Sequence, residues 1–168
     1  PAAYRLRWDY RDMIHTVDLG GGGRAYYQYD ASKERTRKVI VGDTENGQWE
    51  RRYLGGMEVY RRTVSGALVE EIETHHLFAG EQRVLIVEDV LETRNTDLGV
   101  GARFRYQYGN HIGSACMELD ESAAVISYEE YHPYGTSAYL AGRSAAEVRL
   151  KRYRYTAKEW DAETGLDY

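Results

Sequence analysis

The sequence has 168 residues, enough for one domain of ordinary size, and carries 22 Lys and Arg against 27 Asp and Glu. The net charge of -5 argues against a nucleic-acid partner, because phosphate-binding surfaces concentrate Lys and Arg. No run of about eighteen apolar residues occurs, and the first ten residues carry charges where a signal peptide needs an apolar stretch. The sequence therefore predicts neither membrane insertion nor a signal peptide.

Residue usage indicates an all-β fold. The chain has 16 Tyr and 17 Gly but only 2 Pro, a combination of aromatic strand formers and turn residues. Cys116 is the only cysteine, so one chain has neither an internal disulfide nor a thiolate metal site. We expect no cofactor and no metal.

The predicted strands are short and follow a period of two. Tyr27 and Tyr29 share one face across Gln28. The run 84–87 is continuously apolar and too short for a helix, which favours a strand covered on both sides. In 103–108 aromatic and polar residues alternate, which predicts one packed face and one wet face.

Turn residues separate these runs and define hairpins. Asp120 to Ser122 lies between the apolar-rich segments 117–119 and 125–128, which predicts one such hairpin. The segment 152–155 alternates Arg and Tyr and predicts another strand. Further turns are predicted at Gly20–Gly23, Asn46–Gly47, Gly55–Gly56, Ala79–Gly80 and Asn110–His111.

A helix of one or two turns is predicted at only one place, residues 143–148. Ser144 is placed to cap it, with Glu147 three residues later as the partner of a capping box. No Pro-rich or Ser-rich linker interrupts the chain, so we expect one continuous structural segment over residues 1–168.

Pairs of neighbouring ionisable residues suggest catalytic or metal chemistry only weakly. The side chains of His75 and His76 point to opposite faces of a strand, so they do not readily share an ion. The same argument separates the carboxylates of the pairs 70–71 and 129–130, which favours ion pairs with Arg over a glycosidase site. The four glycines 20–23 lack the Lys-Ser or Lys-Thr that follows a phosphate loop.

A weak internal repeat points to a family. Residues 27–32 followed by 37–40 have the form strand, Asp-containing turn, strand, and residues 8–12 are a looser copy. The first copy resembles the YD repeat of Rhs proteins, and residues 52–60 are similar to a segment of their insecticidal-toxin relatives. Three later segments, 109–115, 127–135 and 154–161, resemble in order and spacing the run into the Rhs-associated core.

The resemblance covers nearly the whole chain and is nearest to the C components of Tc toxin complexes. The core is expected to begin near residues 154–168. The residues that match the family motifs are expected to have a structural role. They are Tyr27, Tyr29, Asp30, Tyr53, Gly55, Gly56, Asn110, His111, Gly113, Ser114, Tyr128, Tyr131, Pro133, Tyr134, Gly135, Tyr155, Lys158, Glu159, Asp161 and Gly165. Ala157 and Trp160 depart from the family pattern, which usually has Gly and Arg there.

The resemblance implies a function as well as a fold. Family members coil many β-hairpins into a hollow shell that encloses a toxic C-terminal polypeptide, so the expected partners are the rest of the shell, that polypeptide and another toxin-complex component. The carboxylates of the family's aspartyl autoprotease are expected beyond Tyr168, so no catalytic residue is assigned. We expect synthesis in the bacterial cytoplasm and export as part of a larger toxin.

Two other functions stay open. Tyrosines on one strand face can stack on sugars, which would make the chain a carbohydrate-binding module of a cell surface. The chain can also be a piece of the autoprotease that lacks its active carboxylates.

Overall fold

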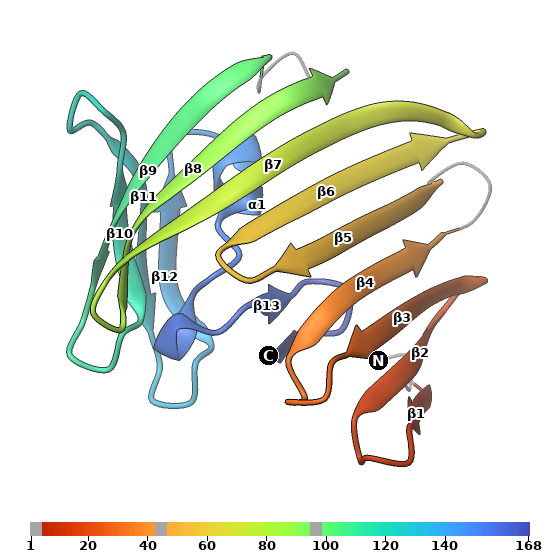
Figure 1. Cartoon of the computed structure of the whole chain (residues 1–168). Coiled ribbons are helices and arrows are strands. Elements are labelled where there is room, and N and C mark those ends of the chain that lie inside the picture. Colours follow the sequence, from red (N-terminus) through yellow and green to blue (C-terminus); the bar gives the residue numbers. More distant parts are fainter. Residues whose placement is uncertain (1–4, 43–46, 95–98) are drawn as a thin grey trace. The chain divides into compact units, whose positions relative to one another are not determined.

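The fold is a long succession of antiparallel β-hairpins. A computed structural model describes residues 5–42, 47–94 and 99–168 (Figure 1). Twelve strands pair in the order in which they occur along the chain, and two short strands near the C-terminus form a separate pair. The all-β fold class predicted from the sequence is confirmed.

The first eight strands are β1 (Arg5–Trp8), β2 (Ile14–Gly20), β3 (Gly23–Tyr29), β4 (Arg35–Val41), β5 (Gln48–Leu54), β6 (Met57–Val64), β7 (Ala67–Ala79) and β8 (Gln82–Thr93). The remaining elements are β9 (Gly101–Gly109), β10 (Ala115–Leu119), β11 (Val125–Tyr131), β12 (Ser137–Gly142), helix α1 (Ala145–Leu150), the 3-10 turn η1 (Tyr155–Ala157), β13 (Trp160–Asp161) and β14 (Leu166–Asp167). No described helix is long and apolar enough to cross a membrane.

The chain divides into two compact units. The first comprises Pro1–Thr74 with Asp89–Gly101, and the second comprises His75–Glu88 with Ala102–Tyr168. In the first unit Val17, Ala25 and Tyr27 form a buried apolar cluster, against which Tyr29 and Ile40 pack. The shared face predicted for Tyr27 and Tyr29 is therefore confirmed.

One five-residue turn recurs through the chain. In the YD hairpin between β3 and β4, the Asp30 carboxylate accepts hydrogen bonds from the backbone N–H of Ser32 at 2.8 Å and of Glu34 at 3.0 Å. Backbone bonds between Asp30 and Glu34 and from Lys33 to Asp30 complete the turn, and Lys33 has a left-handed φ of 66°. This is the local bonding that Asp favours, because its short side chain reaches the backbone two residues on.

Three other turns repeat this geometry. Asp9 bonds the N–H groups of the second and fourth residues after it, which confirms the looser repeat copy between β1 and β2. Asn110 does the same between β9 and β10, and Asp120 does so between β10 and β11. The fourth residue of each turn has positive φ: Asp12, Gly113 and Ala123. The hairpin predicted around 120–122 is confirmed.

The turn between β11 and β12 keeps the backbone pattern without the side-chain bonds of Asp or Asn. The His132 N–H donates to the Thr136 carbonyl at 2.8 Å, and the Gly135 N–H donates to the His132 carbonyl at 3.0 Å. Glycine turns follow the predictions at 20–23, 55–56 and 79–80. Of the turn predicted at Asn46–Gly47, Asn46 lies outside the described residues.

Two predicted strands have different outcomes. The apolar run 84–87 lies within β8, although only Ile86 is fully buried there. The strand predicted at 152–155 is wrong. Tyr153 makes a single bridge to Glu159, and Tyr155 begins the turn η1, because Thr156 and Ala157 adopt left-handed φ values of 48° and 58° that end extended structure.

Candidate functional site: a buried ionic cluster in the second unit

In β9 the charged and polar side chains are buried and the aromatic side chains are exposed, which is the reverse of the pattern in an ordinary apolar core. Arg105 and Gln107 are buried, with 1% and 6% of their surface exposed, whereas Tyr106 and Tyr108 are 38% and 52% exposed. The period of two correctly predicts two different faces. The face that is covered is the charged one.

Helix α1 and the chain that follows it provide this cover. The helix packs against β11 and β12. The Ser144 side chain accepts a hydrogen bond from the Glu147 N–H at 3.2 Å, so the predicted cap is confirmed. The Glu147 carboxylate binds Arg103 and Arg105, so this side chain belongs to the cluster.

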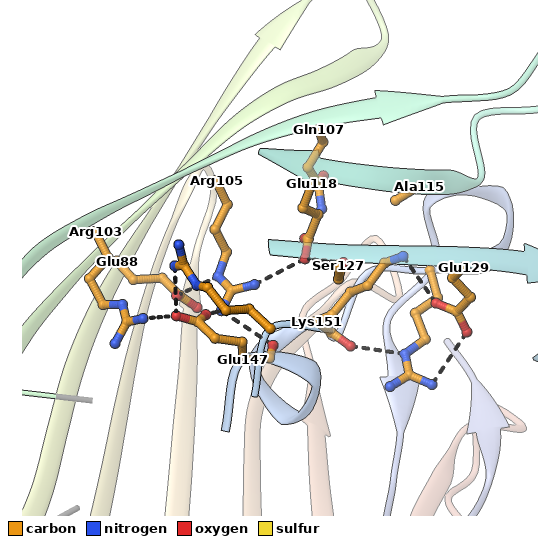
Figure 2. A network of polar contacts seen from close by, with 12 residues as sticks. Glu88, Arg103, Arg105, Gln107, Ala115, Glu118, Ser127, Glu129, Glu147 and Lys151 are labelled. Carbon is orange, nitrogen blue, oxygen red and sulfur yellow. Dashed lines mark hydrogen bonds and ion pairs between the residues drawn. The ribbon is translucent and has the colours of Figure 1, made fainter. Parts of the chain in front are cut away.

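Arg105 is the centre of the cluster (Figure 2). Its Nε donates to Glu88 on β8 at 2.9 Å, and its Nη1 donates to Glu118 on β10 at 2.9 Å. Its Nη2 donates to the carboxylate of Glu147 and, at 3.3 Å, to the carbonyl oxygen of the same residue. One guanidinium thus joins two strands and the helix, which uses the forked donor geometry that lysine lacks.

Neutral donors complete the environment of Glu118. Gln107 Nε2 donates to one carboxylate oxygen at 3.0 Å, and Ser127 Oγ donates to the other at 2.8 Å. Glu118 and Ser127 are both completely buried. Because a buried charge is costly when it lacks partners, this saturation is what makes the charged interior compatible with folding.

Glu129 on β11 is the anchor of a second group of charges. Its carboxylate lies 3.1 Å from Lys151 Nζ and 3.6 Å from Arg154 Nη1. It also accepts hydrogen bonds from Ser137 at 2.5 Å and from Tyr131 at 2.9 Å. Lys151 and Glu129 are both fully buried side chains, so the segment after α1 is held through an ion pair.

The partners of Glu129 control how it titrates. Burial alone would raise the pKa of the Glu129 carboxyl, but the hydrogen bond from Ser137 and the charges of Lys151 and Arg154 outweigh burial and hold that pKa below its ordinary value. Burial, followed by the charge of Glu129, raises the pKa of Tyr131 far above its ordinary range. Glu129 is therefore ionised and Tyr131 is neutral at pH 7.

Three of the family motifs meet beside Glu129. The Thr156 N–H donates to Ser114 Oγ at 3.0 Å. The single proton of the Tyr131 hydroxyl is shared between Glu129 and the Ala115 carbonyl, whose oxygen lies 2.8 Å from the hydroxyl oxygen. The Tyr155 hydroxyl donates to the Pro133 carbonyl at 2.6 Å. The structure thus brings together residues from segments 109–115, 127–135 and 154–161, which are separate in the sequence.

Gly135 is required by this junction for two reasons. Its φ of +89° lies in the region that favours glycine, and a Cβ at this position would lie 2.8 Å from the ring of Tyr155. The rings of Tyr131 and Tyr155 lie 5.9 Å apart, a usual separation for packed aromatic side chains.

Residues at the C-terminal end close the site. Arg152 binds the buried Glu159 at 2.9 Å, and backbone bonds of 3.0 and 2.8 Å join Glu159 to Tyr168. The buried Asp161 begins a turn in which its carbonyl accepts from the Gly165 N–H at 2.7 Å. Trp160, one of the departures from the family pattern, lies under the Arg154 guanidinium at 4.4 Å.

Other motif residues lie outside this junction. Tyr53, Gly55 and Gly56 belong to the β5–β6 hairpin, where Tyr53 lies opposite Glu58. The exposed motif residues are Asp30, Gly55, Gly56, Asn110, His111, Tyr128, Pro133, Tyr134, Lys158 and Gly165.

The remaining candidates for chemistry have structural partners. His75 is exposed, whereas His76 packs edge-on against Tyr153 at 5.0 Å, so the two rings do not converge. Glu71 binds Arg61 at 2.7 Å, as the prediction of an Arg partner requires. Among the described residues no group of His, Cys, Asp and Glu has the geometry to hold a metal ion.

Sequence reasoning missed the centre of the cluster. No local pattern groups Arg105, Glu118, Glu147 and Lys151, because each lies in a segment whose own pattern explains it without the others. A usable signal was present in β9, where Arg105 and Gln107 alternate with aromatic residues. The pattern itself does not indicate which face is covered.

Comparison with known proteins gives consistent relatives, although no family model matches the chain. The chain is 38% identical to toxin subunit YenC1 of Yersinia entomophaga over 84% of its length, and 34% identical to toxin subunit YenC2 of the same organism over 97% of its length. It is also 25% identical to the tRNA3(Ser)-specific nuclease WapA of Bacillus spizizenii. It spans only 15% and 17% of the lengths of the two Yersinia subunits.

Solved structures give the same result. Crystal structures of TcdB2-TccC3 match 99% of the chain with a TM-score of 0.88 and 31% identity. The Photorhabdus luminescens Tc holotoxin pore matches with the same TM-score, identity and coverage of the chain. The chain corresponds to 8% of either matched chain.

The strand order, the recurring Asp or Asn turn and these matches define a segment of YD-repeat β-sheet. The chain is an Rhs protein like the C component of insecticidal Tc toxins. The family resemblance predicted from its motifs is confirmed.

Proposed function

We propose that this chain is a piece of the wall of a Tc- or Rhs-type toxin shell, and that it contributes to enclosing a toxic C-terminal polypeptide. The observation that carries the proposal is the match of almost the entire chain, 98% at a TM-score of 0.88, to a TcdB2-TccC3 structure. A wall has to pass from strand to strand without gaps, and the consecutive antiparallel order supports that role.

We further propose that the chain catalyses no reaction by itself. Its buried carboxylates Glu118 and Glu129 are saturated by cations and hydroxyl donors. A catalytic acid or base exchanges a proton with its substrate. The acceptor positions of these two carboxylates are instead occupied by groups of the protein. The charges therefore serve to fix α1 and the segment after it.

The partners follow from the same proposal. They are the neighbouring parts of the shell, the polypeptide that the shell encloses and a second component of the toxin complex. Synthesis in the bacterial cytoplasm and export within the larger toxin complete the proposal.

A chimaera tests the enclosing role. The chain replaces the matching residues of YenC1, and limited proteolysis follows the polypeptide C-terminal to the graft. The expected result is a fragment that resists protease in the native chimaera and is digested after detergent opens it. A folded chimaera whose C-terminal polypeptide is digested as fast as the free polypeptide would overturn the proposal.

A matched variant separates structure from assembly. The same chimaera with Arg105→Met should lose protection, because the cover of the second unit depends on that guanidinium. A chimaera with Tyr134→Ala, which alters a side chain that is 94% exposed, should keep it.

A second candidate function is carbohydrate binding, favoured by one specific surface. Tyr106, Tyr108, Tyr128 and Tyr139 are 38–56% exposed, and the rings of Tyr128 and Tyr139 lie 6.2 Å apart. The Tyr128 hydroxyl donates to Glu130 at 2.9 Å, which places a carboxylate acceptor beside an aromatic surface. Saturation-transfer NMR with neutral oligosaccharides should give a signal that Tyr128→Ala and Tyr139→Ala remove, and no signal would exclude this function.

A further inference from the structure

Residues 143–159, which include α1 and the turn η1, cover the charged face of the second unit and are called the strap below. The helix packs against β11 and β12, and η1 packs against β10. Figure 2 shows Glu147 and Lys151 of the strap pointing toward side chains of the strands. The strap is not one of the twelve strands of the sheet, so its release would leave every strand pair of that sheet intact.

The strap is held mainly by charged side chains. Three of its described side chains are fully buried, and all three are charged: Glu147, Lys151 and Glu159. The described apolar and aromatic side chains Val148, Leu150 and Tyr155 are only half-buried. Burial of apolar surface, which is the usual force that holds a segment against a fold, therefore contributes less here than ion pairing does.

The strap and the strand groups beneath it carry opposite net charge. The strap contains six Lys and Arg against two Glu. The charged strand and turn residues of the cluster and its margin are four carboxylates and two guanidiniums, namely Glu88, Glu118, Asp120, Glu129, Arg103 and Arg105. The Debye length falls from about 10 Å at 0.1 M salt to about 3 Å at 1 M. Salt therefore favours separation of the basic strap from the acidic face.

Opening of the strap differs from the loss of one partner of an ion pair. When Lys151 leaves Glu129, water solvates both ions, whereas a substitution leaves one ion buried without its partner. The attraction within a buried pair is largely offset by the desolvation of its two ions. The closed strap therefore has a small advantage over the open one, and such segments open at a lower free energy than the whole fold.

The second half of the strap keeps its own shape. The Arg154 N–H donates to the Lys158 carbonyl at 3.0 Å, and the Lys158 N–H donates to the Tyr155 carbonyl at 2.9 Å. Arg152 binds Glu159 at 2.9 Å. These bonds lie within the strap and do not depend on the sheet, which favours release as one unit.

We propose that the strap is a conformational device that opens and closes as a unit over the charged face of β9, β10 and β11, and that salt promotes its opening. The twelve strands stay paired in the open state. The face that opening uncovers is charged, so no large apolar patch is created and the open chain stays soluble. The inference goes beyond the enclosing role, because it gives the second unit a reversible opening that ionic strength controls.

Native-state hydrogen exchange of the chain in 0.1 M and 1 M NaCl tests the proposal. The reporters are the amides of Val148, Lys151 and Thr156, which donate hydrogen bonds in the closed strap. A helix as short as α1 is not stable once it is released. These amides should exchange at least about tenfold faster in 1 M NaCl, whereas amides that pair β10 with β11 should change less than about twofold. Equal responses of strap and strands, or strap exchange that salt does not accelerate, would overturn the proposal.

A substitution with a matched control separates the charges of the strap from its packing. Glu147→Gln removes the charge that binds Arg103 and Arg105, so strap exchange in 0.1 M NaCl should accelerate at least about tenfold and its dependence on salt should shrink. Glu130→Gln makes the same change at an exposed position of β11 and should alter neither quantity. A salt dependence that Glu147→Gln leaves unchanged would refute ionic control of the strap.

Discussion

The interior of the second unit is more heavily charged than that of the first, although both units bury apolar and charged side chains. In the first, Val17, Ala25 and Tyr27 exclude water by apolar packing, and in the second, Arg105 and Glu118 are buried as ion pairs. Apolar packing is tolerant, because its energy depends mainly on buried area and volume. An ionic interior is demanding, since every charge needs its own partner at a fixed place. The covered face of a sheet therefore need not be apolar, provided that each buried polar or charged group has a hydrogen-bond or ion-pair partner.

The largest expected effect is the loss of Arg105. Arg105→Met leaves the carboxylates of Glu88, Glu118 and Glu147 without their central cation, and removing one partner of a buried ion pair costs about 3 to 5 kcal/mol. Urea unfolding followed by circular dichroism measures the loss. Val17→Ala in the first unit is the control and should cost about 1 to 3 kcal/mol. An equal loss in the two variants would remove the distinction between the interiors.

A second substitution shows whether the unpaired charge is the cause. Glu118→Gln in the Arg105→Met background should recover part of the lost free energy of unfolding, because one uncompensated carboxylate disappears. A double variant that is less stable than Arg105→Met would show that the unpaired charge of Glu118 is not the cause of the loss.

The next effect separates two tyrosines that both donate to a glutamate. Tyr131→Phe removes a partly buried hydroxyl that bonds Glu129 and the Ala115 carbonyl, and we expect a loss of about 1.5 to 3 kcal/mol. Tyr128→Phe removes an exposed hydroxyl bonded to Glu130 and should change the free energy of unfolding much less. Thermal and urea unfolding of both variants provide the comparison. Similar losses would mean that burial does not decide the value of these bonds.

The recurring turns should behave alike in both units. Asp30→Ala and Asp120→Ala each remove a side chain that accepts from two backbone N–H groups. By analogy with helix caps, each substitution should lower the free energy of unfolding, with a somewhat larger loss for Asp120 because it also binds Arg143 at 2.6 Å. Chemical denaturation of the two variants checks this, and a loss confined to one unit would show that the turns are not equivalent.

Acidification should weaken the second unit through Glu129. Because the pKa of Glu129 in the folded chain lies below its ordinary value of 4.5, ionised Glu129 stabilises the fold above that pH, and this contribution is lost as the pH falls through the folded pKa. The difference in unfolding free energy between wild type and Glu129→Gln should therefore shrink between pH 7 and pH 3. A difference that stays constant over this range would exclude Glu129 as the titrating group.

The smallest expected effect is a gain. Ala157 has a φ of 58°, and an L-residue other than glycine pays about 1 kcal/mol in that region. Ala157→Gly should therefore raise the free energy of unfolding by up to about 1 kcal/mol, a value reduced by the greater freedom of glycine in the unfolded chain. Differential scanning calorimetry detects the rise in melting temperature. A lower melting temperature would mean that the Ala157 methyl group makes packing contacts that outweigh the strain.

Local patterns predicted most of the fold, and their limits have a physical reason. Period-two alternation, Asp30 and Asp120 at turns and the Ser144 cap depend on neighbours within a few residues, so the sequence reveals them. The covered face of β9 depends on α1 and Lys151, which lie more than about forty residues further along the chain. Alternation defines two faces, and only tertiary packing selects between them.

The same distinction explains what was found of the candidate site. The motif residues Ser114, Tyr131 and Tyr155 were selected by family resemblance, and the structure brings them into one junction. The cations Arg105 and Lys151 are ordinary charged residues in sequence, and only their burial makes them special. The segment 152–155 has the alternating pattern of a strand, but the backbone turns at the residues that follow it.

The five-residue turn constrains how such a sheet changes in length during evolution. Each turn reverses the chain within a fixed number of residues. One added strand would therefore reverse the direction of every strand that follows it, whereas two added strands would leave that direction unchanged. A single-residue insertion within a strand would move each following side chain to the other face, and would expose Arg105 or bury Tyr106. Descendants of this sheet should therefore gain and lose whole hairpins, and their alignments should show gaps about twenty residues long, the length of two strands with their turns.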